Sequence, residues 1–194
     1  KCLYNKEFVF QRNVSASKWK WGKLDMGRFY TFLFRFLLFV FLQVFIFNQL
    51  EINPYIHIMV SPLYIMLLPF EMSVIRLLLV SFLLGIFIDA FSNTFGLHAS
   101  SLVFLAYIRP VVFRWFAPRD GYDNIKTPSI FDMGNRWFLI VFGILLIFHH
   151  LWFFMMESFS FGELLLILQK TFPSALLSFT VCIILQTLFL KKSN

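Results

Sequence analysis

Long apolar stretches are the feature of this sequence that most restricts its fold. A helix needs about 20 mostly apolar residues to cross the ~30 Å hydrocarbon core of a bilayer, and about 17 can suffice. Stretches of this length cover residues 29–50, 52–70, 74–91, 97–116, 137–156 and 171–190. They are continuous and do not alternate with a period of two residues, as strands of a membrane barrel would. We therefore predict an all-α membrane protein with six transmembrane helices.

The composition also predicts a lipid environment. Of the 194 residues, 59% are hydrophobic and 14% are charged, whereas about a quarter of the residues in soluble domains are charged. The net charge is +7. The Lys and Arg residues lie in an N-terminal cluster, at helix ends and in one loop, without the long basic face typical of nucleic-acid-binding proteins. We therefore expect a lipid bilayer, and no nucleic acid, as a partner.

The distribution of basic residues predicts the topology. Segments rich in Lys and Arg stay in the cytoplasm. With the N-terminus inside, the cytoplasmic segments are 1–28, the turn 71–73, 117–136 and 191–194, and all but the short turn contain Lys or Arg. The external connections around Glu51, at 92–96 and at 157–163 contain no Lys or Arg. This pattern predicts a multi-pass protein with both termini in the cytoplasm.

The connections predict how the helices follow one another. The first three are at most five residues long, so helices 1 to 4 are expected to be antiparallel neighbours. The single long connection covers residues 117–135. Within it, Ser129 followed by Asp132 predicts the start of a short helix.

The N-terminal residues differ from the rest of the chain. Residues 1–25 are polar and basic, and the first Met is Met26. We expect these 25 residues to be an extension outside the natural domain, and residues 26–194 to form one six-helix membrane domain. Cys2 and Cys182 lie far apart and have no metal-ligand or redox spacing, so we expect no disulfide.

Asp89 is the only carboxylate inside a predicted span. Ionisable groups within a bilayer are costly and are therefore candidates for function, but Asp89 lies only two residues from the predicted outer end. Ser81, Gly85 and Asp89 recur every four residues and share one helix face, where small residues allow close helix packing. We expect Asp89 to hydrogen-bond the adjoining turn 92–96. A proton or solute site and a contact with a partner are the alternatives.

Arg109 and Pro110 interrupt the fourth stretch. At ~1.5 Å per residue, Asp89 lies about 3 Å and Arg109 about 18 Å below the outer surface, too far apart for a close ion pair. We interpret Arg109 as structural. Its side chain either extends to the cytoplasmic headgroups or satisfies carbonyl groups that are freed where Pro110 kinks the helix. A role facing a partner protein is the second interpretation.

No residue set has the spacing of a known catalytic or metal site. His149 and His150 are adjacent, so their side chains point in different directions on a helix, and the other His residues do not complete a recognised ligand set. Nucleotide-binding loops, nucleophile elbows and zinc-protease motifs are absent from the sequence. We expect no catalytic residue, cofactor or metal, and no enzyme activity.

Three segments, taken in order, resemble the MreD family of rod shape-determining membrane proteins. They are Gly85–Ala99 (GIFIDAFSNTFGLHA), Arg109–Pro110 and Pro118–Tyr122 (PRDGY), the last being similar to the Bacteroidota branch of that family. The resemblance runs from about Met26 to Leu190. The order of the segments, together with the size and the predicted topology, carries the match.

The resemblance implies a non-catalytic component of the bacterial cell-elongation (rod) complex in the inner membrane, which scaffolds peptidoglycan synthesis and regulates cell shape. Its partner would be a MreC-type periplasmic scaffold and, indirectly, a MreB-type filament, a RodA-type SEDS polymerase and a class B penicillin-binding protein. The fold would be similar to the substrate-binding component of energy-coupling vitamin transporters. The alternative function is a small-solute-binding membrane subunit of a transporter.

Candidates for contacts with partners or between helices lie on the Gly85 face, in the turn 92–98 and on the cytoplasmic side. They are Ser81, Gly85, Asp89, Asn93, Gly96, His98, Arg109, Pro110, Arg119, Asp120 and Tyr122. Helices associate in membranes by close packing and interhelical hydrogen bonds, because apolar burial gives no preference over lipid. We therefore expect partner helices to dock on the Gly85 face, the turn 92–98 and the loop 117–135.

Overall fold

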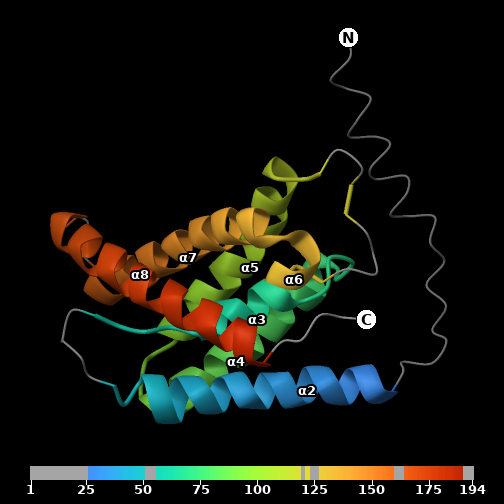
Figure 1. Cartoon of the computed structure of the whole chain (residues 1–194). Coiled ribbons are helices and arrows are strands. Elements are labelled where there is room, and N and C mark those ends of the chain that lie inside the picture. The colour runs from blue at the N-terminus through green and yellow to red at the C-terminus, as the bar shows by residue number, and fades with distance from the viewer. Residues whose placement is uncertain (1–25, 51–55, 119–120, 123–126, 160–163, 190–194) are drawn as a thin grey trace. The chain divides into compact units, whose positions relative to one another are not determined.

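The computed structural model describes residues 26–50, 56–118, 121–122, 127–159 and 164–189. The helices are α2 (Met26–Phe41), the π-helix η1 (Leu42–Phe47), α3 (Ser61–Leu67), α4 (Val74–Ser92), α5 (Leu97–Trp115), α6 (Ile130–Met133), α7 (Asn135–Ser158) and α8 (Leu164–Phe189), coloured along the chain in Figure 1. These residues contain no β-strand. The prediction of an all-α protein is confirmed over this part of the chain.

The chain forms two compact units, residues 1–34 and residues 35–194. The described residues of the first unit are the beginning of α2. The second unit contains the rest of α2 and all the other helices.

Among the residues that the structure describes, four helical stretches are long and apolar enough to cross a membrane. They are Tyr30–Phe47, Val74–Ser92, Asn135–Ser158 and Leu164–Leu188. Large apolar side chains point away from the protein along them, such as Ile75, Leu79 and Phe82 on α4. Because only lipid makes such surfaces favourable over the length of a helix, the protein is a multi-pass membrane protein.

The helices of the second unit pack mainly in the order of the chain. α4 packs against α5, α5 against α7, and α7 against α8, while the short α3 contacts α4, α5 and α7. All seven residues of α3 are buried. The second unit therefore contains a short helix that is covered by longer ones.

The second predicted span, residues 52–70, is not the continuous helix that we expected. Residues 57–60 have no regular structure, and α3 follows them for only two turns. Proline residues explain these limits. Pro62 stands in the first turn of α3, where its missing N–H is tolerated. Leu68 precedes Pro69 and is extended, with a ψ of 146°, because a residue before proline avoids the helical conformation.

The other predicted spans are helical, with different ends. α8 begins at Leu164 instead of at residue 171, and α5 continues through Pro110 to Trp115. The short helix that Ser129 and Asp132 predict is confirmed as α6, where Ser129 Oγ accepts a hydrogen bond from the backbone N–H of Asp132 at 3.3 Å.

Candidate functional site

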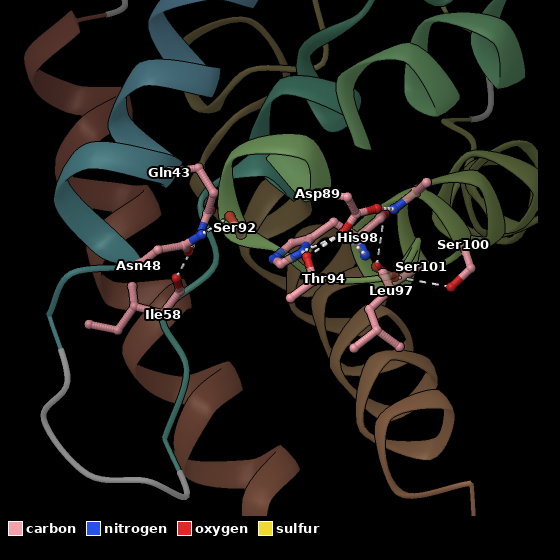
Figure 2. Close-up of polar contacts among 11 residues, drawn as sticks. Gln43, Asn48, Ile58, Asp89, Ser92, Thr94, Leu97, His98, Ser100 and Ser101 are labelled. Carbon is pink, nitrogen blue, oxygen red and sulfur yellow. Dashed lines mark hydrogen bonds and ion pairs between the residues drawn. The ribbon is translucent and has the colours of Figure 1, made fainter. Parts of the chain in front are cut away.

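The turn between α4 and α5 is built around the carboxylate of Asp89, which is 7% exposed. Its Oδ1 accepts hydrogen bonds from Thr94 Oγ1 at 2.6 Å and from the backbone N–H of His98 at 3.0 Å. Its Oδ2 accepts one from the backbone N–H of Ala99 at 2.9 Å. Figure 2 shows Thr94 and His98 turned toward Asp89. The carboxylate thus satisfies the first N–H groups of α5, and the expected hydrogen bonding of Asp89 to the adjoining turn is confirmed.

The imidazole of His98 and the shape of the backbone complete this turn. His98 Nδ1 lies 3.1 Å from Asp89 Oδ1, and because a carboxylate only accepts, Nδ1 carries the proton in this contact. Asn93 and Gly96 adopt the left-handed conformation, with φ of 54° and 81°, which Asn and Gly tolerate best. Asn93 and Gly96 therefore act through the backbone.

Gly85 lies where α4 and α5 approach each other. A Cβ atom on Gly85 would lie 2.2 Å from the Cα of Ala99, so only glycine permits this approach. Ser81 is fully buried, and its Oγ donates to the carbonyl of Leu77 at 2.7 Å. The Gly85 face is covered by α5, and our expectation that a partner helix docks on it is therefore wrong.

The side chain of Gln43 holds the non-helical segment before α3. Gln43 is fully buried in the π-helix η1. Its Oε1 accepts hydrogen bonds from the backbone N–H groups of Val60 at 2.7 Å and Ser61 at 3.3 Å, and its Nε2 donates to the carbonyl of Ile58 at 3.1 Å. Non-helical backbone inside a membrane protein needs such partners. One side chain thus supplies hydrogen bonds that a continuous helix would have made itself.

A second set of contacts connects Gln43 with the end of α4. Gln43 Nε2 also donates to Asn48 Oδ1 at 2.7 Å, and Asn48 Nδ2 donates to Ser92 Oγ at 2.6 Å. Ser92 is the last residue of α4, close in the chain to Asp89, and Figure 2 shows the two groups of contacts together. The segment before α3 and the α4–α5 turn are therefore anchored at the same end of α4.

α8 holds the same segment through a row of hydroxyl groups. Ser174 Oγ accepts a hydrogen bond from the backbone N–H of His57 at 3.1 Å, and Ser178 Oγ accepts one from that of Met59 at 2.9 Å. The spacing of the two N–H groups matches that of the two hydroxyl groups, because two residues of extended chain rise about 6.6 Å and four residues of helix rise about 6 Å. The row continues every four residues with two fully buried residues, Cys182 and Gln186.

Ser178 connects this segment to α7 through His150. His150 Nδ1 lies 2.9 Å from the carbonyl of Leu146 and must donate to it, so in a neutral ring Nε2 accepts the hydroxyl proton of Ser178 at 3.1 Å. The hydrogen bonds then run in one direction from Met59 through Ser178 and His150 to Leu146. The neighbouring His149 is also fully buried, and its ring nitrogens have no hydrogen-bond partner among the described residues.

Arg109 lies inside the protein and is 3% exposed. Its Nη2 donates to the carbonyl of Met66 at 3.2 Å and to that of Leu68, and its guanidinium carbon lies 4.5 Å from the ring centre of Phe113. A cation is favourable at the C-terminal end of a helix, here α3. The structural interpretation of Arg109 is therefore confirmed. Our expectation that it reaches the headgroups is wrong, and the carbonyls that it satisfies belong to α3 and the residue after it.

Aromatic side chains gather beside Phe113. The ring of Tyr122 stacks on Phe70 with 4.4 Å between centroids, and its hydroxyl donates to the carbonyl of Phe113 at 2.6 Å. Trp137 Nε1 donates to the carbonyl of Phe116 at 2.9 Å. Burial raises the pKa of Tyr122 to about 12. These contacts attach the beginning of the long loop to the ends of α5 and α7.

The predicted candidates occupy three places and do not form one site. Asp89, Asn93, Gly96 and His98 form the α4–α5 turn, Ser81 and Gly85 line the contact between α4 and α5, and Arg109, Pro110 and Tyr122 belong to the last part of α5 and the loop after it. Arg119 and Asp120 lie outside the described residues.

Sequence reasoning missed Gln43, Ser174 and Ser178, which bind the central segment. Their signal was available in part, because Ser174, Ser178, Cys182 and Gln186 repeat every four residues in an otherwise apolar helix. In the structure, Ser174, Ser178 and Cys182 contact backbone groups of residues 57 and 59, whereas Gln186 has no hydrogen-bond partner among the described residues. Gln43 has no comparable pattern around it.

The polar side chains of this arrangement form hydrogen bonds with backbone groups of the chain itself. Among the described residues, no group of three or more His, Cys, Asp or Glu side chains could hold a metal ion. The carboxylate, amide, hydroxyl and guanidinium groups bind chain segments that lack helical partners. No protein-family model, characterised protein or solved structure matches this chain.

Proposed function

We propose that this protein is a non-catalytic scaffold of the MreD type, with six membrane crossings and both termini in the cytoplasm of a bacterial cell. In this role it belongs to the cell-elongation complex of the inner membrane. It holds a MreC-type partner in a fixed geometry and so positions peptidoglycan synthesis relative to a filament in the cytoplasm. Its arrangement of helices would be similar to that of the substrate-binding component of vitamin transporters.

α5 would supply one of the two further crossings. Its 19 residues extend about 28 Å at ~1.5 Å per residue, close to the ~30 Å hydrocarbon core. The charged group within it, Arg109, is directed into the protein and bound there. The charge therefore does not prevent α5 from lying in the bilayer.

Residues 56–68 would supply the other crossing. An extended residue rises about 3.3 Å and a helical one about 1.5 Å, so the segment can extend over roughly 28 Å. Non-helical backbone is tolerated at membrane depth where protein surrounds it. Met59, Val60 and Leu63 are at most 1% exposed, which meets that condition.

The proposed topology agrees with the positions of the charges. Arg76, Arg114 and Arg136 stand at helix ends on the cytoplasmic side. Lys170 is an exception within the first part of α8, toward the outer side, where its Nζ lies 3.2 Å from Glu157 Oε2. The positive-inside rule tolerates such a paired residue, because it counts the overall bias of the loops.

The proposal rests on which groups the buried polar side chains bind. Gln43, Ser174, Ser178 and Arg109 bind the backbone of the central segment. A solute-binding subunit needs convergent polar groups that remain free for its ligand. These four groups are committed to the backbone, which favours a fixed framework over a transporter subunit, whereas His149 and Gln186 are buried without a hydrogen-bond partner among the described residues.

The α4–α5 turn is the surface that we assign to the MreC-type partner. The side chain of Phe95 is fully exposed there, and Phe91 is 60% exposed. Four hydrogen-bonding contacts to Asp89 fix the turn that carries these two side chains. A large aromatic side chain on a rigid support is typical of residues that dominate binding energy.

Co-purification from the native organism tests this assignment. We expect Phe95→Ala to reduce recovery of a MreC-type protein at least fivefold, with unchanged amounts of the chain itself. Phe82→Ala, on the side of α4 that faces lipid, is the matched control and should recover the partner normally. Equal recovery with both variants would remove the turn from the partner surface. Normal cell shape after depletion, with no MreC-type protein recovered, would overturn the whole proposal.

Two further measurements separate the alternatives. In a chain with Cys2 and Cys182 replaced, a cysteine at position 131 should not react with an impermeant reagent added to intact spheroplasts. Its labelling would contradict the six-crossing topology. A vitamin that raises the Tm of the purified protein in proportion to its concentration would indicate a solute-binding subunit instead.

A further inference from the structure

The end of the bundle where α5 stops and α7 starts carries two exposed arginines, Arg114 and Arg136. Neither forms an ion pair with the residues that the structure describes. Trp115, next to Arg114, is 68% exposed. An exposed cation beside an exposed Trp is typical of the boundary between hydrocarbon and headgroups.

Each arginine stands at the end of an apolar strip. On α5, Tyr107, Val111 and Arg114 are spaced four and three residues apart and so share one face of the helix. Tyr107 is 65% and Val111 38% exposed. Both side chains are available to a molecule that lies along α5 and ends at Arg114.

α7 repeats this arrangement in the opposite chain direction. Arg136 is followed on the same face by Leu139 and Ile140, three and four residues later. Leu139 is 37% and Ile140 42% exposed. The two ends are joined by the hydrogen bond from Trp137 Nε1 to the carbonyl of Phe116 at 2.9 Å.

We propose that this end of α5 and α7 binds an anionic phospholipid, with its phosphate at Arg114 and Arg136 and its acyl chains along the apolar strips. The surface matches both parts of such a molecule, cations at the headgroup and apolar side chains at the tails. An acidic peptide would use only the arginines. A basic residue near an anionic membrane surface contributes about fivefold to binding.

Binding is measured on the full chain in a neutral detergent by thermal shift, with three probes. They are dioctanoyl phosphatidylglycerol, dioctanoyl phosphatidylcholine and glycerol 3-phosphate. We expect the anionic lipid to raise the Tm at lower concentrations than phosphatidylcholine, and glycerol 3-phosphate to have no effect at the same concentrations. Equal effects of the two lipids, or an equal effect of glycerol 3-phosphate, would overturn the proposal.

Variants assign the effect to this surface. Arg114→Gln and Arg136→Gln should each weaken the response to the anionic lipid about fivefold, and both side chains are exposed, so the fold should be kept. Arg76→Gln is the matched control, because it removes the same charge from an exposed position at the beginning of α4. An equal loss in Arg76→Gln would show a general charge effect and contradict the assigned surface. The result does not depend on the proposed scaffold function.

Discussion

The side-chain oxygen of Gln43 accepts a hydrogen bond of 2.7 Å from the backbone N–H of Val60, a residue with no exposed surface. The two residues lie in different segments, Gln43 in the π-helix η1 and Val60 at the N-cap of α3. π-Helical turns are rare and occur often at functional positions. Here the π-turn accompanies an amide side chain that replaces backbone hydrogen bonds in the middle of the protein.

Gln43→Leu should therefore destabilise the protein strongly. The change leaves the N–H groups of Val60 and Ser61 and the carbonyl of Ile58 without this partner. Each buried group left unsatisfied costs about 1–3 kcal/mol, so we expect a loss of about 3 kcal/mol or more. The measurement is thermal or denaturant unfolding in detergent. Gln169→Leu, the same change at an exposed position of α8, should have almost no effect, and equal losses in both would contradict the role of Gln43.

The sequence predicted the parts of the fold that depend on local pattern. Length and hydropathy located the long helices, and the cap at Ser129 located α6. The hydrogen bonding of Asp89 was also predictable, because its partners, Thr94, His98 and Ala99, are at most ten residues away in the chain. Contacts between residues that lie close together in the chain can be predicted from the sequence.

The parts that were missed depend on distant contacts. Arg109 binds carbonyls more than 40 residues earlier, and Ser178 binds a backbone N–H more than 100 residues earlier. Depth along a helix placed Arg109 near the headgroups. That estimate could not include α3. The three prolines in the 52–70 stretch indicate an interrupted span, but they do not indicate which residues pack against it. Tertiary contacts, and not hydropathy, decide where such groups are satisfied.

Two glycines of similar appearance in the sequence should respond in opposite ways to alanine. A Cβ at Gly85 would lie 2.2 Å from the Cα of Ala99, whereas one at Gly143 would meet only a ring atom of Phe179 at 3.7 Å. Gly85→Ala should cost about 3 kcal/mol, because α4 and α5 must move apart. Gly143→Ala should be neutral or stabilise by up to about 1 kcal/mol, through helix propensity. Unfolding of both variants in the same detergent provides the test, and similar stabilities would disprove the close contact at Gly85.

Arg109→Met should destabilise the protein although Met suits an apolar interior. The substitution removes the donor for the carbonyls of Met66 and Leu68 and the cation beside Phe113. Two buried carbonyls without a donor correspond to about 2–6 kcal/mol. Arg114→Met is the matched control, because Arg114 is exposed on the same helix. If the two variants unfold at the same Tm, Arg109 does not hold α3.

The stability of the protein should decrease between pH 10 and pH 12 because of Tyr122. Its pKa is raised to about 12 by burial, from about 10 in an unfolded chain. The neutral hydroxyl is therefore favoured in the folded state, and its contribution is complete below pH 10 and lost as the pH rises through 12. Two pKa units correspond to about 2.7 kcal/mol, and we expect about 1 kcal/mol because Tyr122 is only half-buried and screened by solvent.

Unfolding over this pH range distinguishes Tyr122 from the other five tyrosines. Tyr122→Phe should reduce the decrease in stability between pH 10 and 12, at the cost of the hydrogen bond to the carbonyl of Phe113, about 1 kcal/mol at neutral pH. Tyr107→Phe, at an exposed position of α5, should keep the full decrease. An identical pH dependence in wild type and Tyr122→Phe would show that the hydroxyl of Tyr122 ionises as freely in the folded protein as in the unfolded chain. The stacking on Phe70 would then not bury it.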